Sequence, residues 1–194
     1  MKVIEFFGMP KAGKTTALEV VESYFKSKKA RIRTVYEGAR VCPLDKSDRF
    51  HYNAWSFHNT MNRVLEARLN HYDYVLVDRG VIDHLAFTEA IGPIRGTYEY
   101  IATKDYYRQF LDLQDQEIYF TIDIDEALRR EAKHNPFTGR VMEREFLMHL
   151  AKSYEVVIKE DATRKGRKIE TLDGNLPMKE NIRRVLSWCE SLEN

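Results

Sequence analysis

Residues 8–16 read Gly8-Met9-Pro10-Lys11-Ala12-Gly13-Lys14-Thr15-Thr16, and this stretch decides the fold. It matches the pattern G-x-x-x-x-G-K-[ST] and lies between a predicted strand over residues 2–7 and a predicted helix that follows Thr15. The glycines at positions 8 and 13 allow backbone dihedral angles that a β-carbon forbids, so successive N–H groups can turn toward a phosphate at a helix N-terminus. The sequence therefore predicts a phosphate-binding loop, and every residue of the stretch is a candidate nucleotide contact.

The side chains of this loop predict how a nucleoside triphosphate is held. Lys14 adds a positive charge to the β- and γ-phosphates, and the Thr15 hydroxyl is a ligand for Mg²⁺. Lys11 is a second cation in the loop, and it either faces the γ-phosphate or is a solvated loop lysine. The alternative to the whole interpretation is a glycine-containing turn that precedes a helix by chance. That alternative requires the lysine, the hydroxyl and the strand-to-helix setting to agree by accident, so we favour the phosphate loop.

Short segments rich in β-forming residues alternate with longer helical stretches along the chain. The strands are predicted at residues 2–7, 31–36, 74–77, 118–124 and 168–172. The helices are predicted from Thr15 to about residue 27, and then at about 48–69, 104–114, 126–133, 143–159 and 178–192. This alternation indicates an α/β fold with a parallel sheet covered by helices on both faces. No repeat, low-complexity tract or linker interrupts the pattern, so residues 1–194 are expected to form a single domain.

The charge balance argues against several classes of function. The 194 residues include 31 Lys and Arg against 30 Asp and Glu, a formal net charge of +1, so no overall field would hold the chain on nucleic acid or an anionic membrane. The apolar runs fall far short of the ~20 residues that span a bilayer, and the N-terminus lacks a signal-peptide pattern. We therefore expect a cytoplasmic protein. Cys42 and Cys189 lie far apart with no Cys/His cluster near them, which argues against a disulfide framework or a structural zinc site.

Charged residues follow the predicted strands at the edge where an open α/β sheet binds its ligands. Asp78 directly follows the apolar strand over residues 74–77, a position that places a carboxylate beside the Mg²⁺ held by Thr15. Arg79 then supplies a guanidinium for a phosphate oxygen or for Glu37. The alternative is a structural ion pair between Asp78 and Arg79.

Glu37 follows the second strand and is the candidate general base. Its carboxylate would lie opposite the γ-phosphate and accept a proton from an attacking hydroxyl group. Arg40 is expected to hold an anionic group of the substrate or to orient Glu37. The alternative is a loop glutamate that is simply paired with Arg40.

The aromatic stretch over residues 50–58 is the candidate wall of the acceptor site. It falls in the predicted helix 48–69, between the second and third strands, where Trp55 and Phe57 would stack on a planar ring. Aromatic side chains on a helix are as often part of the core, and the sequence leaves these two interpretations open.

A basic helix and the loop after it predict a lid over about residues 126–145. The helix carries Arg129, Arg130 and Lys133 and runs into His134-Asn-Pro-Phe-Thr-Gly139-Arg140. Cations on such a cover would lie over the transferring phosphate and help to exclude water. The alternative is a solvated helix face, which is the usual fate of charged runs.

These features resemble the P-loop kinases of nucleosides and nucleotides, in particular the thymidylate kinase and deoxynucleoside kinase family. The phosphate loop, the strand end Asp78-Arg79-Gly80, the basic helix and the closing segment Leu172-Asp-Gly-Asn-Leu-Pro177 stand in the order of that family and cover nearly the whole chain. The resemblance implies a P-loop NTPase fold with a five-stranded parallel sheet in the order 2-3-1-4-5 and a helical lid. It also implies Mg-ATP as the phosphate donor, adenine packed near Arg129 and Asn175, and a homodimer.

Other details bear on the acceptor. The phosphate loop is similar to that of thymidylate kinases, whereas Glu37 followed by Trp55 and Phe57 is similar to the deoxynucleoside kinases, whose glutamate at this strand end is the base. We therefore predict an ATP- and Mg²⁺-dependent kinase that phosphorylates a nucleoside or nucleoside-like small molecule, with Lys14 and Arg79 stabilising charge. A nucleoside monophosphate kinase is one alternative, and a P-loop ATPase or switch acting on a macromolecular partner is another. The lack of a basic patch with interleaved aromatics argues against a kinase of nucleic-acid ends.

Overall fold

The computed structural model describes residues 1–92, 97–134, 140–166 and 169–193. Its strands are β1 (Lys2–Gly8), β2 (Ile32–Val35), β3 (Tyr74–Asp78), β4 (Gln116–Thr121) and β5 (Glu170–Asp173). Its helices are α1 (Lys14–Ser27), α2 (Arg49–Arg68), α3 (Val81–Ile91), α4 (Thr97–Arg108), α5 (Ile124–His134), α6 (Arg144–Lys165) and α7 (Met178–Glu193). Short 3₁₀ turns occur at η1 (Gly38–Val41), η3 (Leu111–Leu113) and η4 (Arg140–Met142).

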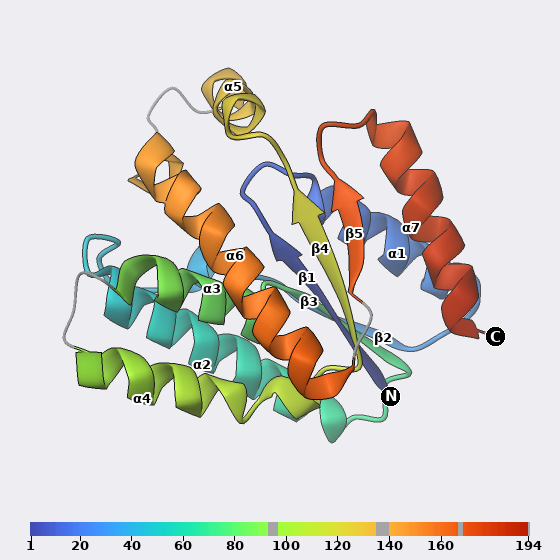
Figure 1. The fold of residues 1–194 in the computed structure, drawn as a ribbon. Coiled ribbons are helices and arrows are strands. Elements are labelled where there is room, and N and C mark those ends of the chain that lie inside the picture. Colours follow the sequence, from blue (N-terminus) through green and yellow to red (C-terminus); the bar gives the residue numbers. More distant parts are fainter. Residues whose placement is uncertain (93–96, 135–139, 167–168, 194) are drawn as a thin grey trace.

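The five strands form one parallel sheet in the order β2-β3-β1-β4-β5 (Figure 1). β1 is central and pairs in parallel with β3 on one side and with β4 on the other. Residues 3–8 of β1 are buried, as expected for a strand covered on both faces. The predicted α/β class, the parallel sheet and the strand order implied by the resemblance are confirmed.

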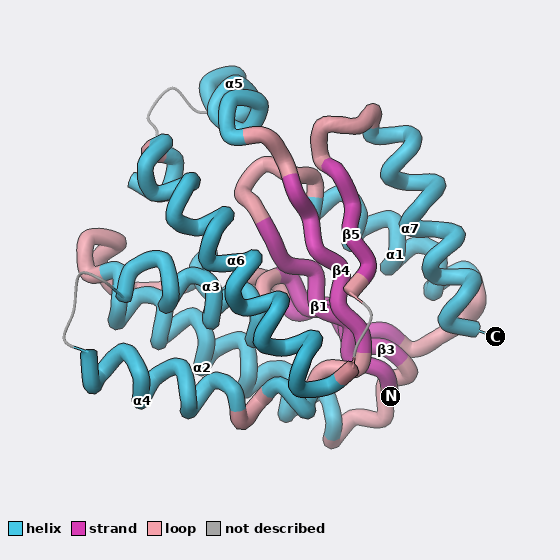
Figure 2. The backbone as a smooth tube through the Cα atoms, viewed as in Figure 1, coloured by secondary structure: helices cyan, strands magenta, loops and turns pink. Residues whose placement is uncertain are grey.

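Helices cover both faces of the sheet, as the alternating pattern predicts (Figure 2). α1 and α7 lie side by side on one face, and α2, α3, α4 and α6 form the layer on the other face. α5 lies beyond the carboxyl end of β4 (Figure 1). The loops that follow β1, β2 and β3 meet at this same end of the sheet, where the predicted ligand site lies.

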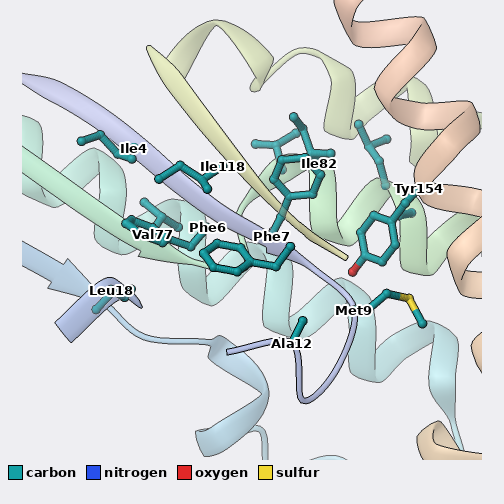
Figure 3. Packing of buried hydrophobic residues seen from close by; sticks show 14 of the residues in the cluster. Ile4, Phe6, Phe7, Met9, Ala12, Leu18, Val77, Ile82, Ile118 and Tyr154 are labelled. Carbon is teal, nitrogen blue, oxygen red and sulfur yellow. The ribbon is translucent and has the colours of Figure 1, made fainter. Parts of the chain in front are cut away.

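The hydrophobic core extends from β1 to the helices on either side of it (Figure 3). Phe7 of β1 packs against Tyr154 of α6, with ring centroids 6.0 Å apart. Ile82 of α3 and Leu18 of α1 belong to the same buried cluster. The rigid packing around β1 fixes the direction in which the chain leaves the strand to form the phosphate loop.

Two predicted elements differ clearly from the structure, and one helix of the structure is not predicted. The sequence pattern does not predict α3, because this helix is buried on nearly all sides and lacks the polar face of an amphipathic helix. The helix predicted at 104–114 corresponds to α4, which begins at Thr97 and ends at Arg108. The strand predicted at 118–124 is β4, which ends at Thr121 because the chain turns into α5 at Ile124.

The described part of the chain contains neither a membrane span nor a self-contained metal site. None of its helices combines the length and the apolar character needed to cross a membrane. No group of three or more His, Cys, Asp or Glu side chains within it is arranged to hold a metal ion. Among the described residues, neither Cys42 nor Cys189 takes part in a disulfide bond.

Candidate active site

The predicted phosphate loop is formed as a tight turn between β1 and α1. Gly8 and Gly13 have φ angles of +125° and +98°, which only glycine adopts without strain. A β-carbon at Gly8 would also lie 2.3 Å from the carbonyl oxygen of Phe120. α1 begins directly after Gly13, and no side chain of the described residues caps its N-terminus. The loop therefore fits a phosphate, because free backbone N–H groups at a helix N-terminus bind anions.

Lys14 is folded back into this loop. Its ammonium donates hydrogen bonds to the carbonyl oxygens of Gly8 and Met9, at 2.9 and 2.7 Å. Burial, together with the positive charge of Arg79, lowers the pKa of Lys14 to about 7. A bound phosphate would replace the two carbonyl partners and favour the charged form of the side chain.

Lys11 and α5, the helix predicted to form a lid, are in direct contact. The Lys11 ammonium lies 2.6 Å from the Glu131 carboxylate of α5. Arg130 of the same helix donates hydrogen bonds to the carbonyl oxygens of Lys11 and Gly174, at 3.0 and 2.8 Å. One guanidinium thus connects α5 to the phosphate loop and to the loop after β5, a contact that the sequence pattern does not reveal.

Arg129 and Asn175, the residues expected near adenine, are both exposed. Arg129 is more than half exposed and forms an ion pair with Glu126 on its own helix. The Asn175 side chain accepts a hydrogen bond from the backbone N–H of Asp123, at 3.1 Å. This bond joins the loop after β4 to the loop after β5. Residues 135–139 of the predicted lid lie outside the described residues.

Arg79 is the centre of the charged groups at the end of β3. Its Nε lies 3.2 Å from the Glu37 carboxylate, and its Nη1 donates to both carboxylate oxygens of Asp83, at 3.0 and 2.8 Å. Burial by itself would lower the pKa of Arg79. The negative charges of Asp83 and Glu37 outweigh this effect and raise the pKa above its usual value, so the guanidinium stays charged. Its backbone is left-handed, with φ +63°, and its guanidinium also lies over the Phe87 ring. Arg79 is therefore held rigidly beside Glu37.

Asp83 and Tyr154 are site residues that the sequence pattern does not indicate. The Tyr154 hydroxyl donates to Asp83 at 2.6 Å and also lies 3.0 Å from the carbonyl oxygen of Gly8. The backbone N–H of Gly8 donates to Asp83 at 3.2 Å. Figure 3 shows Tyr154 reaching from α6 with its hydroxyl oxygen directed toward the loop that carries Met9. The buried pair connects the first residue of the phosphate loop to Arg79.

Glu5 fixes the start of the helix that follows Arg79. Its buried carboxylate accepts hydrogen bonds from the backbone N–H groups of Gly80, Ile82 and Asp83, at 2.9, 3.2 and 3.0 Å. Burial, with a smaller contribution from the charge of Asp83, raises the pKa of Glu5 to about 8 even though the backbone bonds lower it. Glu5 thereby holds the N-terminus of α3 against β1.

Asp78 is buried at the carboxyl end of β3, as the sequence predicts. Its described ion-pair partner is Arg40, at 3.3 Å, rather than Arg79, and burial raises the pKa of Asp78. The interpretation of Arg40 as the partner of Glu37 is therefore wrong, because the guanidinium reaches across to the neighbouring strand end. One carboxylate from Asp78 and one hydroxyl from Thr15 are donors that suit Mg²⁺ when phosphates and water complete its coordination.

A cavity of about 330 Å³ lies beside the phosphate loop. Its size falls in the ~300–1,000 Å³ range of small-ligand sites. Pro10 of the loop lines it, and so do the predicted site residues Glu37, Arg40 and Arg79. Its other walls come mainly from α2 and α3 and include Tyr52, Asn53, Ser56, His84 and Phe87. The cavity thus brings a carboxylate and a guanidinium next to the loop that would hold a triphosphate.

Trp55 and Phe57, the aromatic residues predicted to contact the acceptor, are not among the described residues that line this cavity. Phe57 is 0% exposed and stacks on Tyr107 with ring centroids 3.7 Å apart, so its prediction as a substrate contact is wrong. It shares a helix face with the buried Met61, and this face packs on the core. Trp55 is half-buried and is not one of the described residues that line the cavity. The face of α2 turned to the cavity carries Arg49, Tyr52, Asn53 and Ser56.

Comparison with known proteins places this geometry in a known class of fold. No family model matches the chain, and no curated protein matches its sequence. Solved structures do match over almost the entire chain, and they give it the fold of a P-loop kinase.

One such structure is a deoxyadenosine kinase from M. mycoides with bound dATP, which covers 98% of this chain and 100% of its own. It has 20% sequence identity and a TM-score of 0.70. The kinase with bound dCTP covers 97% of this chain and 99% of its own, with 18% identity and a TM-score of 0.69. At this level of identity the likeness establishes the fold, and the function must be argued from the site.

Proposed function

We propose that this protein is an ATP- and Mg²⁺-dependent kinase that transfers a γ-phosphoryl group to a hydroxyl of a nucleoside or nucleoside-like small molecule. One observation carries the proposal: Glu37 and Arg79 lie 3.2 Å apart on the wall of a cavity that begins at Pro10 of the phosphate loop. A base, a fixed cation and a phosphate loop around one small cavity are the parts that phosphoryl transfer requires. The deoxyadenosine kinase fold supports the same conclusion.

The donor side of the site consists of residues 8–16. The backbone N–H groups of the loop would bind the β- and γ-phosphates, and Lys14 would turn from the carbonyl oxygens of Gly8 and Met9 toward them. Thr15 and Asp78 would hold Mg²⁺, which supplies charge neutralisation on the phosphates when bound. Arg129 and Asn175 are the proposed neighbours of adenine, and α5 is the proposed lid over the donor.

The acceptor side consists of Glu37 and Arg79. Glu37 accepts the proton of the acceptor hydroxyl while the oxygen forms a bond to the γ-phosphorus and the bond to ADP breaks. Arg79 fixes the Glu37 carboxylate and places positive charge beside the transferring group. Alignment in the cavity then supplies much of the rate, because little covalent chemistry is left for the protein.

A second candidate function is supported by the cations of the cavity. Arg40, Lys46 and Arg49 line the wall together with Arg79. Such a wall suits a nucleoside monophosphate as the acceptor, because an anionic group would be held there. In that case the nucleophile is already an anion, and Glu37 acts as a positioning residue.

The test is a measurement of ADP release from Mg-ATP with a panel of nucleosides and nucleoside monophosphates. The proposal expects strong stimulation by a nucleoside, and Lys14→Ala should abolish it. Stimulation by monophosphates alone selects the second candidate. A basal hydrolysis rate that no small acceptor changes would favour an ATPase or switch instead.

The proposal also includes a homodimer and a cytoplasmic location. Tyr98 and Ile101 of α4 are exposed apolar side chains, and they support a subunit contact on this helix. Sedimentation analysis of the protein and of Tyr98→Ser measures the oligomeric state.

A further inference from the structure

We propose that the cavity selects an acceptor whose ring presents N–H donors, as the amino-bearing edges of adenine and cytosine do, and that Asn53 and His84 are the residues that read this edge. The inference rests on the proposed nucleoside kinase function and extends it to the choice of base. It follows from the hydrogen bonds that the two side chains make with α3, because these bonds determine which atoms are left for a ligand.

The orientation of the Asn53 carboxamide is fixed by Thr88. The Thr88 hydroxyl donates its single hydrogen to the carbonyl oxygen of His84, at 2.8 Å, so its oxygen is left as an acceptor. Asn53 Nδ2 lies 2.9 Å from that oxygen and 3.2 Å from the same His84 carbonyl. Both neighbours accept, so the amide nitrogen must face them and Oδ1 must point away.

Asn53 Oδ1 is available to a ligand. Asn53 lies on the wall of the cavity. Within the described ranges of the chain, Oδ1 receives no protein donor, and it is not one of the polar atoms enclosed without a partner. Its lone pairs are therefore directed to open space beside α2, where they require a hydrogen-bond donor.

His84 supplies a second acceptor from α3. Its Nδ1 lies 2.6 Å from the carbonyl oxygen of Gly80, which can only accept, so Nδ1 carries the hydrogen. Burial lowers the pKa of His84 and keeps the ring neutral. Nε2 is then an unprotonated acceptor on a residue that lines the same cavity.

The two acceptors favour one kind of ring edge. An amino group donates to such a wall, whereas a carbonyl oxygen in the same place would face lone pairs and lose its hydrogen bond to water. Phe87 and Ile91 provide apolar surface on the walls, which suits the faces of a planar base. Sites built to hydrogen-bond a polar group of the substrate discriminate strongly against analogues that lack it.

The experiment compares 2′-deoxyadenosine with purine 2′-deoxyriboside, which has the same ring system without the amino group. The wild-type protein should bind and phosphorylate deoxyadenosine better by about tenfold or more, the equivalent of one net hydrogen bond of ~1.4 kcal/mol. Asn53→Ala should bring this ratio close to one. Asn59→Ala, on the same helix but outside the described cavity wall, should keep it.

Calorimetric binding and phosphorylation are measured separately in this experiment. Equal binding of the two nucleosides, or tighter binding of thymidine, overturns the inference about the base even if the protein is a kinase. Preferential binding of deoxyadenosine that Asn53→Ala removes supports the inference. If the bound nucleoside is never phosphorylated in the presence of Mg-ATP, the proposed function fails while the base preference stands.

Discussion

The Tyr154 hydroxyl lies 2.6 Å from the Asp83 carboxylate, and this contact joins α6 to both halves of the candidate site. Asp83 also binds the Arg79 guanidinium and the backbone N–H of Gly8. Burial raises the pKa of Asp83, but the charges of Arg79 and Lys14 and the bond from Tyr154 lower it, so the carboxylate stays ionised. The phosphate loop and Arg79 therefore share one buried anion, the Asp83 carboxylate.

Tyr154→Phe tests this connection. The variant removes one donor from a buried carboxylate, so we expect the free energy of unfolding to fall by about 1–3 kcal/mol. We also expect kcat to fall by about tenfold, because Arg79 and Gly8 both depend on the position of Asp83. Chemical denaturation and steady-state kinetics measure the two effects. Tyr107→Phe is the matched control, since the buried Tyr107 hydroxyl has no hydrogen-bond partner among the described residues.

We expect the Lys14 side chain to take up a proton when a nucleotide binds. With a pKa of about 7, the side chain is largely neutral at pH 8, and a bound triphosphate favours its charged form. Affinity for Mg-ATP should fall as the pH rises from 7 to 9. Calorimetry at pH 8 in two buffers of different ionisation enthalpy should show proton uptake, and Lys14→Met should remove it. Binding that is independent of the buffer would contradict the prediction.

Glu37→Gln separates a general base from a positioning residue. Glutamine keeps a hydrogen bond to Arg79 but cannot accept a proton, so turnover of a hydroxyl acceptor should fall by ~10²–10⁴. Affinity for the acceptor should change little. With a monophosphate acceptor the loss should be far smaller. Near wild-type turnover of a nucleoside would show that Glu37 is not the base.

Substitution by alanine should have different effects at Phe57 and at Phe87, because the first lies in the core and the second on the cavity wall. Phe57→Ala should destabilise the fold by about 3–5 kcal/mol, because Phe57 is fully buried and stacked on Tyr107. Phe87→Ala, on the cavity wall, should weaken acceptor binding more than ATP binding. Thermal unfolding and the two affinities distinguish them. A selective loss of acceptor binding in the Phe57 variant would restore its role as a substrate contact.

The raised pKa of Glu5 should make the free energy of unfolding depend on pH. Its pKa is raised from 4.5 to about 8 in the folded protein, so the folded state holds a proton that the unfolded state releases between these values. The Glu5 contribution to stability is therefore present below about pH 4.5 and is lost as the pH rises toward 8. The difference in unfolding free energy between wild type and Glu5→Gln should decrease over this range. A constant difference between pH 5 and pH 8 would refute the titration.

The sequence predicts the parts of the fold that depend on local patterns. The phosphate loop is contiguous and is defined by the glycine, lysine and hydroxyl positions between Gly8 and Thr16, and its strand-to-helix setting is found as expected. α3 escapes prediction because it is buried between α2, α4, α6 and the sheet, which leaves no polar face. The hydrogen bond between Tyr154 and Asp83 joins α6 to α3, which are far apart in the sequence, so no local sequence pattern predicts it.

The aromatic stretch on α2 shows a second limit of sequence interpretation. Composition identifies a helix beside the candidate acceptor site, but a shift of one residue on a helix turns a side chain by about 100°. Ser56 therefore lines the cavity while the next residue, Phe57, faces the core. The sequence locates the helix, and only the packing of α2 on α3 decides which residues touch a ligand.

The central position of β1 has a consequence for biosynthesis. β1 pairs with β3 and β4, and β4 begins roughly 110 residues after β1. At common translation rates the ribosome therefore makes β4 roughly 5–20 s after β1. The first strand is thus made long before its neighbours exist, and its Phe6 and Phe7 side chains stay uncovered meanwhile. We expect the phosphate loop, although it is encoded first, to be among the last parts of the nascent chain to take shape. Mg-ATP would then stabilise only the completed protein, and early chains would depend on chaperones for protection from aggregation.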